Sequence, residues 1–291
     1  MAKRKKSRKK SKFPISLFIY LATAATGITA WNSCSETTVA NEPENPAPDP
    51  SDPDIGGDVK HYPGLETVSL PDNLTSQIKE YVGFTVSFNK DNRTPNYVAW
   101  ELLGDEVKTD IDRSDNFWTD PDIEGCPSTK DYTRSGYDRG HMCPAADQKW
   151  SQQAMDDCFV MANICPQDHS LNAGAWNTLE SKERQWAQRD SAIMIIAGPI
   201  YDTSDTKRIG NAGVRVPGAF FKVLMAPYVN EPRGIAFVYP NMTSPGNMQD
   251  YAMSIDELEK ILGYDFFPAL PDRIEEMVEK TYSFKEWNSS K

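Results

Sequence analysis

The chain has 291 residues, of which 39% are apolar, and this is enough to bury a sizeable core in one large domain or two small ones. The formal net charge is −11, and it falls to −19 once the eight basic residues among the first twelve positions are removed. An acidic body of this kind argues against a protein that binds nucleic acid through its overall charge.

The N-terminal segment has the pattern of an export signal. The basic stretch MAKRKKSRKKSKF precedes an uncharged run over residues 14–31, an order that is typical of secretory signals. Two anchors fit it, because Cys34 follows the run and would be acylated in a bacterial lipoprotein, whereas an uncleaved run would form one membrane-spanning helix. We therefore expect residues 1–34 to be a signal peptide or membrane anchor. The chain is expected to be exported and held at a bacterial membrane, on its periplasmic or outer side, with the lipoprotein favoured.

The next segment, residues 35–58, is expected to be a disordered tether. Its main part reads NEPENPAPDPSDPDIGGD, with Ile55 as the only large apolar residue, so it cannot bury enough surface to fold. From Val59 onward there is no internal repeat and no second Pro-rich linker. Residues 59–291 are therefore expected to form one domain.

The domain contains both strand-like and helix-like stretches. Stretches rich in β-branched and aromatic residues predict strands over residues 81–89, 96–104, 158–165, 191–201, 219–227 and 234–241. Helices are predicted over residues 173–190, 254–263 and 272–281, and the second opens with a capping-box pattern and stops at a glycine. The strands and helices do not alternate strictly, so an α+β fold is expected rather than a doubly wound one.

The first candidate for chemistry is a histidine in a polar motif. The chain has only three histidines, and His141 lies in DRGH at residues 138–141. Arg139 would point to the same side of a strand-like segment as His141, which would put an anion-binding guanidinium beside a proton acceptor. His61 and His169 are expected to lie at the surface.

The second candidate is the predicted helix over residues 173–190. Its apolar stripe is formed by Trp176, Leu179, Trp186 and Ala187. Glu180 and Arg184 flank that stripe and would lie along one edge of the helix. The alternative is an ordinary amphipathic helix in which these two residues form an exposed i,i+4 ion pair worth about 0.2–0.5 kcal/mol.

Together the two segments resemble the DNA/RNA non-specific endonuclease family, the ββα-metal or His-Me finger nucleases. The shared motifs are DRGH, N-x-x-P-Q at 163–167 and L-N-x-G-x-W-x-x-L-E at 171–180, with RSDNFWTDP at 113–121 and PNYVAWEL at 95–102 upstream. The resemblance covers residues 80–270 and implies a ββα-metal fold with a central, mainly antiparallel sheet and flanking helices.

The resemblance also implies an activity and a role for each site residue. The activity would be metal-dependent hydrolysis of phosphodiester bonds in DNA, RNA or both, without sequence specificity and with the nucleic-acid backbone as partner. The implied roles are His141 as general base, Asn172 as direct ligand of Mg²⁺ or Mn²⁺, Glu180 as acceptor for metal-bound water, Arg139, Arg184 and Arg113 as phosphate ligands, and Asn163 as support for the geometry. Local positive charge from these arginines, Lys149 and residues 182–189 would offset the acidic net charge.

The cysteines and the activity each leave an alternative open. An exported chain with four cysteines in this domain favours disulfides, which we predict as Cys143–Cys165 and Cys126–Cys158. The alternative is a zinc site built from these cysteines and His141 or His169, although no C-x-x-C pair is present. For the activity, the alternative is a catalytically weak nucleic-acid-binding surface lipoprotein on the same fold. The presence of both His141 and Asn172 favours the enzyme.

Overall fold

The computed structural model describes residues 64–202, 206–244 and 246–289, all of which belong to one compact unit, Pro48–Lys291. The predicted signal or anchor and the whole predicted tether lie outside the described residues, as does His61. Within the described part of the chain, no helix is both long enough and apolar enough to cross a bilayer.

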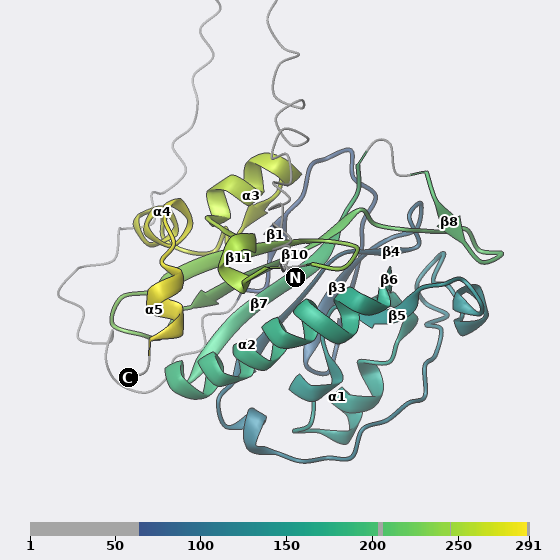
Figure 1. Ribbon diagram of the computed structural model, residues 1–291, viewed down its shortest axis with the longest axis horizontal. Coiled ribbons are helices and arrows are strands. Elements are labelled where there is room, and N and C mark those ends of the chain that lie inside the picture. Colours follow the sequence, from purple (N-terminus) through teal and green to yellow (C-terminus); the bar gives the residue numbers. More distant parts are fainter. Residues whose placement is uncertain (1–63, 203–205, 245, 290–291) are drawn as a thin grey trace, which may run out of the picture. The chain divides into compact units, whose positions relative to one another are not determined.

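A seven-stranded antiparallel sheet forms the centre of the fold (Figure 1). Its strands, in spatial order, are β12 (Ala252–Met253), β11 (Arg233–Pro240), β10 (Ala219–Ala226), β7 (Ala192–Ile200), β4 (Thr94–Leu103), β3 (Phe84–Asn89) and β2 (Gln77–Tyr81). Helices flank this sheet, so the predicted α+β fold with an antiparallel sheet is confirmed.

The remaining elements are short and lie around the sheet. The helices are α1 (Gln152–Asp157), α2 (Asn177–Asp190), α3 (Ile255–Leu262), α4 (Asp272–Lys280) and α5 (Phe284–Asn288). Paired short strands are β1 (Val68–Ser69) with β13 (Asp265–Phe266), β5 (Asp138–His141) with β6 (Ile164–Gln167), and β8 (Arg208–Ile209) with β9 (Val214–Arg215). Single helical turns are η3 (Glu106–Lys108), η4 (Thr129–Tyr132), η5 (Ala145–Asp147), η6 (Met161–Asn163), η7 (Leu171–Trp176) and η8 (Met248–Tyr251).

Both faces of the sheet are buried, and β7 shows how the sequence divides them. Ile193 and Ile195 point into the core that contains the apolar stripe of α2, as predicted for that helix. Met194 and Ile196 point into a second core, which contains residues of α3 and α4. The side chains of a strand alternate between its faces, so an uninterrupted apolar strand such as β7 serves two cores at once.

The antiparallel pair of strands β5 and β6 and the helix after it form a ββα unit at the edge of the first core. In this pair, Gly140 lies opposite Cys165 and His141 opposite Ile164. The chain then enters η7, whose wide turn is broken at Gly174, and continues into α2. This order brings the DRGH strand and the polar edge of α2 to the same region of the molecule.

Two predicted strands differ from the observed structure. The stretch over residues 81–89 is divided by a turn at Gly83, where φ is +97°, so it contributes to β2 and β3. The stretch over residues 158–165 is mostly a turn followed by η6. Apart from an isolated bridge between Val160 and Trp118, strand pairing begins at Ile164. The Asn163 amide holds this turn by donating to the carbonyl oxygens of Cys143 and Cys158, and such tertiary bonds override local β-propensity.

The predicted helices over 254–263 and 272–281 are present as α3 and α4. At the start of α3 the Ser254 hydroxyl accepts from the backbone N–H of Glu257, and the Glu257 carboxylate accepts from Ser254 N. At its end Gly263 adopts φ +69°, the left-handed conformation that stops a helix.

Candidate active site

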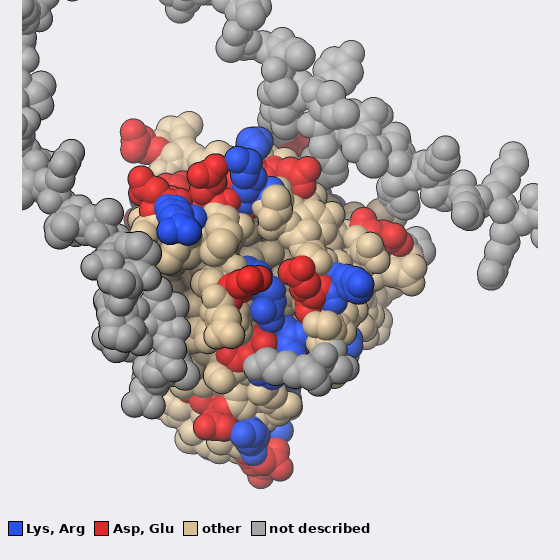
Figure 2. All heavy atoms as spheres, turned by 90° about the vertical axis from the view of Figure 1, so that its left-hand side faces the viewer, with Lys and Arg blue, Asp and Glu red and all other residues tan. Residues whose placement is uncertain are grey.

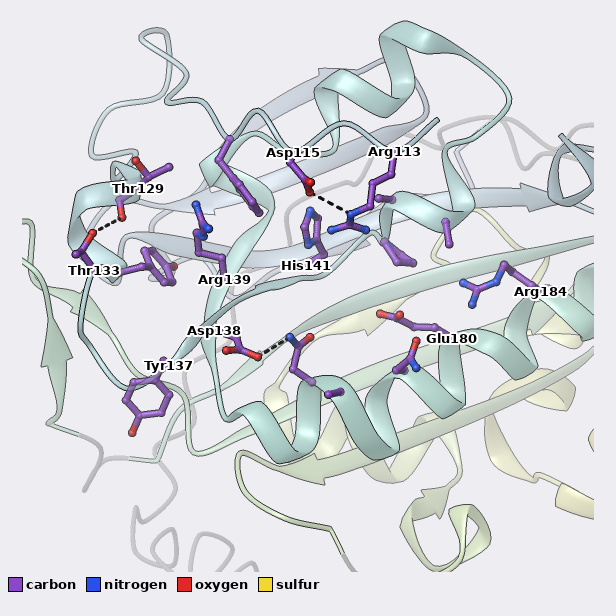
Figure 3. A pocket seen from close by; sticks show the side chains of 18 residues that line it. Arg113, Asp115, Thr129, Thr133, Tyr137, Asp138, Arg139, His141, Glu180 and Arg184 are labelled. Atoms are coloured by element: carbon purple, nitrogen blue, oxygen red, sulfur yellow. Dashed lines mark hydrogen bonds and ion pairs between the residues drawn. The ribbon is translucent and has the colours of Figure 1, made fainter. Parts of the chain in front are cut away.

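A polar pocket of about 790 Å³ lies between the β5 strand and the helix η7–α2 (Figure 3). Six of the seven predicted site residues line it: Arg113, Arg139, His141, Asn172, Glu180 and Arg184. Arg139 and His141 come from β5, whereas Glu180 and Arg184 come from α2 on the other side (Figure 3). The fold therefore brings together groups that are separated by up to 71 positions in the sequence, from Arg113 to Arg184.

His141 lies in an aromatic and cationic setting. Its ring packs edge-on against Phe159 and tilted against Phe117, with centroid distances of 5.0 and 5.4 Å. Its Nε2 is buried and has no hydrogen-bond partner in the protein. Burial lowers the pKa of His141 to about 3, and the charges of Arg113 and Arg139 add to the shift. The imidazole is therefore neutral at physiological pH and able to accept a proton.

The three pocket arginines differ in how they are held. Arg139 lies 4.1 Å from the ring centre of Phe117 and makes no ion pair with any described residue. Arg113 donates to Asp115 at 3.3 Å and lies over Phe159. Arg139 thus keeps its full hydrogen-bonding fork for an anion, whereas Arg113 shares its charge with a carboxylate.

Arg184 is held by the buried carboxylate of Asp147. Its Nη1 donates to Asp147 at 2.9 Å, and the other carboxylate oxygen of Asp147 accepts from Trp100 Nε1 at 3.1 Å. Asp147 is buried, so this pairing fixes the position of the guanidinium. The alternative of an exposed Glu180–Arg184 ion pair is therefore wrong, because Arg184 binds Asp147 instead.

Asn172 is oriented by a carboxylate that the sequence analysis did not assign to the site. Its Nδ2 donates to Asp138 Oδ2 at 2.9 Å (Figure 3), and His169 Nδ1 contacts the same oxygen at 2.8 Å. This arrangement leaves the Asn172 Oδ1 unused by the described residues. Asp138 is the first residue of DRGH, so the signal that could have identified it was its position in the motif. His169 is exposed, as predicted.

Glu180 lies next to a buried ion pair between Lys222 and Glu183. Lys222 Nζ, fully buried on β10, lies 2.7 Å from Glu183 Oε2 and 3.9 Å from Glu180 Oε1. Its ammonium group is also 4.8 Å from the ring centre of Trp176. Burial raises the pKa of Glu180 to about 7, although the charge of Lys222 opposes the shift. Lys222 was also missed, yet a lysine inside the apolar stretch AFFKVLMA is a visible signal.

Asn163 lies beneath the pocket and not in its lining. Besides the two amide donations to Cys143 O and Cys158 O, its Oδ1 accepts from the backbone N–H of Cys143 at 2.9 Å. These bonds tie the chain just after His141 to the chain just before β6. Other predicted basic positions do not reach the pocket, because Lys149 pairs with Asp110 and Arg189 with Asp190.

The predicted disulfides are wrong, because Cys126, Cys143, Cys158 and Cys165 all carry free thiols. Three of them are buried in the first core, where Cys143 accepts from Gln148 and Cys158 donates to the carbonyl oxygen of Met155. Burial raises the pKa of each of these thiols. A zinc site is not supported either, since no cysteine or histidine belongs to a metal-binding group among the described residues.

The donors in the pocket fit a hard, hydrated cation. The candidate donors are an amide oxygen on Asn172 and a carboxylate on Glu180, because the other lining carboxylates, Asp115 and Asp138, accept from Arg113 and Asn172. Two such donors do not form a cage of carboxylates that would strip the water from an ion. Mg²⁺ prefers oxygen ligands and usually keeps several waters. One protein amide with a nearby carboxylate is therefore a donor set that suits Mg²⁺ or Mn²⁺.

Comparisons with known proteins show that the chain is similar to nucleases. Residues 62–273 match a family model described as DNA/RNA non-specific endonuclease. The mitochondrial nuclease EXOG of Danio rerio is 34% identical over 207 residues, which cover 65% of this chain and 60% of the relative. The mitochondrial endonuclease G of Bos taurus is 30% identical over 208 residues, which cover 66% of this chain and 70% of the relative.

A similar fold occurs in one chain of the crystal structure of the EndoG/EndoGI complex, which describes the mechanism of EndoG inhibition. Its TM-score is 0.64 at 27% identity, and the match covers 70% of this chain and 89% of that chain. The chain spans about three fifths of the length of the EXOG relatives that it matches.

Proposed function

The chain belongs to the DNA/RNA non-specific endonuclease family, and on that premise we propose that it is an endonuclease that hydrolyses phosphodiester bonds of DNA and RNA with a divalent metal ion. The family's ββα-metal nuclease fold is the one expected from the sequence. The observation that carries the proposal is the convergence of His141, Asn172 and three arginines on one polar pocket.

The residues of the pocket divide the work of hydrolysis between them. The neutral imidazole of His141 takes a proton from the attacking water, which raises the nucleophilicity of its oxygen. Arg139 donates to the non-bridging phosphoryl oxygens, on which negative charge grows in the transition state, and Arg184 and Arg113 add charge at the pocket walls. Because Asp147 already fixes the Arg184 side chain, little further side-chain entropy is lost when Arg184 binds the substrate.

The metal site follows from the orientation of Asn172. With its Nδ2 bound to Asp138, the Oδ1 is available to hold Mg²⁺ or Mn²⁺, and Glu180 is available to accept from water around the ion. When bound, the ion supplies charge stabilisation at the phosphate and a source of protons for the leaving oxygen. The proposal assigns no base-reading group, because all the residues it uses recognise the backbone.

The competing proposal is a nucleic-acid-binding surface protein on the same fold that does not cleave. Such a protein has no requirement for a proton acceptor with an unpartnered Nε2 next to a metal-binding amide. Both groups are present in this pocket, and they favour the enzyme.

The assay that tests the enzyme uses the purified protein with plasmid DNA and with RNA, in Mg²⁺ or in EDTA. We expect internal cleavage of both substrates in Mg²⁺ and none in EDTA. Asn172→Ala should require a higher Mg²⁺ concentration or lose activity altogether, because it removes the amide oxygen assigned to the ion. Cleavage that persists in EDTA, or an Asn172→Ala titration like that of the parent, would contradict the metal assignment.

The proposal includes a location outside the cytoplasm, at a bacterial membrane. Its support is the sequence of residues 1–34, which lie outside the described residues. Cells that produce the parent or Cys34→Ser, labelled with a radioactive lipid precursor, should be fractionated. Label and membrane association lost together support a lipoprotein, and association without label supports an uncleaved helix. A parent found in the soluble cytoplasmic fraction would contradict both.

A further inference from the structure

A second group of carboxylates lies on the other side of the central sheet, where α3 and α4 cover the second core. Asp256 and Glu259 are three residues apart on α3, and Glu279 lies near the end of α4. One carboxylate oxygen from each of the three lies within 4.8 Å of the other two. These residues contribute nothing to the pocket described above, which is lined from β5, η7 and α2 and their neighbouring loops.

Glu279 is the observation that points to a ligand. The residue is only 5% exposed, and its buried Oε1 has no hydrogen-bond partner in the protein. A buried carboxylate without a partner is costly, so such groups are usually paired or coordinate a metal. The same burial raises the pKa of Glu279 to about 9, and the negative charge of Glu259 adds to the shift.

The lysines of these helices leave Glu279 without a countercharge. Lys260 lies 3.6 Å from Asp256 and is mostly exposed, and Lys280 pairs with Glu276 at 2.9 Å on the outer side of α4. No ion pair with Glu279 occurs among the described residues. Figure 1 places α3 and α4 at the upper left, the side that faces the viewer in Figure 2, where acidic side chains gather with a few basic ones.

We propose that Asp256, Glu259 and Glu279 form a Ca²⁺ site that ties α3 to α4. Carboxylate oxygens are hard ligands, and oxygens bound to one Ca²⁺ at 2.3–2.6 Å lie at most about 5 Å apart, which matches the observed spacing. Mg²⁺ binds at about 2.1 Å and demands ideal octahedral geometry, so the same oxygens would have to move closer together. Glu259 Oε1 already accepts from Phe266 N, which holds this carboxylate in place.

The site would stabilise the layer formed by α3 and α4 against the sheet. A ligand that binds only the folded protein raises the free energy of unfolding. At a Ca²⁺ concentration a hundred times the dissociation constant, the midpoint of thermal unfolding should rise by about 5–10 °C.

Calorimetric titration of the EDTA-treated full chain with CaCl₂, together with thermal unfolding, tests the site. The variant is Glu279→Gln, and the matched control is Glu276→Gln, which removes an exposed carboxylate from the same helix. We expect the parent and the control to bind Ca²⁺ and to gain thermal stability. Glu279→Gln should bind at least about tenfold more weakly, because it loses one of three carboxylate ligands.

Two further variants make the result decisive. Asn172→Ala should keep the Ca²⁺ response, because that residue lies in the other pocket, and a lost response there would overturn the assignment to α3 and α4. Glu279→Gln should unfold in EDTA at a temperature no lower than the parent, since it removes a carboxylate that faces two others. If it fails to fold, Asp256→Asn replaces it with the same expected loss. A parent that shows no Ca²⁺ response, or a variant that titrates like the parent, overturns the proposal.

Discussion

At the scale of single residues, His141 is the group whose environment is most specialised. It is enclosed by Phe117 and Phe159 and flanked by two arginines, so its neutral form is favoured far below physiological pH. No other histidine lines the pocket in the described part of the chain. The proton acceptor of the proposed reaction therefore has no second imidazole in the pocket to replace it.

Because His141 is the proposed general base, we predict that His141→Ala lowers the turnover rate by about 10²- to 10⁴-fold, the usual contribution of such a group. The measurement is the initial rate of plasmid cleavage in saturating Mg²⁺. Thermal unfolding of the variant serves as the control for folding. Turnover within a few fold of the parent, in a folded variant, would rule out His141 as the base.

The pH dependence should come from Glu180 instead. The pKa of this carboxyl is raised to about 7, so it gains a proton as the pH falls below neutrality and can no longer accept from water. Activity should therefore decrease from pH 8 to pH 6, while His141 stays neutral over the same range. Glu180→Gln should be slow at every pH and show no such decrease. If Glu180→Gln showed the same decrease of activity between pH 8 and pH 6, the acid limb of the pH profile, it would contradict the assignment of this decrease to Glu180.

At the scale of elements, the edge of α2 is supported by a charge from a different strand. Lys222 on β10 forms a fully buried ion pair with Glu183 and lies 3.9 Å from Glu180, which lines the pocket. A buried ion pair between a lysine and a well-placed carboxylate can contribute little to the free energy of unfolding. Removal of one partner, however, leaves an uncompensated buried charge and is strongly destabilising. The ion pair therefore links the position of the edge of α2 that lines the pocket to the packing of the core.

We predict that Lys222→Met lowers the free energy of unfolding by about 3–5 kcal/mol. It should also raise the pKa of Glu180 further, because the opposing positive charge is lost, and so move the acid limb of activity to higher pH. Urea unfolding and the pH profile are the two measurements. The double variant Lys222→Met/Glu183→Leu should recover stability without restoring the pH profile of the parent. A stable single variant would show that the pair contributes little.

The pairing of β5 with β6 depends on close approach at one glycine. A Cβ on Gly140 would lie 2.6 Å from Gln167 Cβ, and this is an atom that cannot rotate away. Gly140→Ala should therefore cost about 1–3 kcal/mol of stability and shift the strand that carries Arg139 and His141. We expect a lower unfolding midpoint together with reduced activity. An unchanged midpoint would mean that the β5–β6 pair accommodates the methyl group.

At the scale of the whole molecule, a strongly acidic protein is proposed to bind a polyanion. The net charge is −11, and positive charge at the pocket is limited to Arg113, Arg139 and Arg184. Repulsion from the rest of the surface is long-range and screened by salt, whereas the arginine contacts are local. Binding should therefore be weak and governed by a few phosphate contacts.

Three contacts predict a moderate dependence on salt. With about 0.7–0.9 counterions released per neutralised phosphate, affinity should fall roughly 20- to 40-fold between 50 and 200 mM KCl. Fluorescence anisotropy of labelled DNA, with Asn172→Ala to prevent cleavage, measures it. Arg139→Ala should reduce the slope by about one unit. Arg273→Ala, on α4 at the opposite face, should leave the slope unchanged, and an equal effect of both variants would point to non-local attraction.

Much of the site could be predicted from sequence because its signals are local. The alternation of a strand placed Arg139 and His141 on one side, and helical periodicity placed Glu180 and Arg184 beside the buried stripe of α2. The α+β class and the ends of α3 followed from the same kind of short-range pattern. These features depend on backbone geometry over a few residues, which the order of amino acids determines directly.

Other features were decided only by the tertiary structure, because they depend on distances between remote segments. The partner of Arg184 is Asp147, 37 positions away, and the partner of Glu183 is Lys222, 39 positions away. The free thiols have the same origin, since spacing along the chain does not say which cysteines face each other. The turn at residues 158–163, predicted as a strand, is held by the side chain of Asn163. In each case packing of the whole domain determines burial and neighbours, and these determine the chemistry of the group.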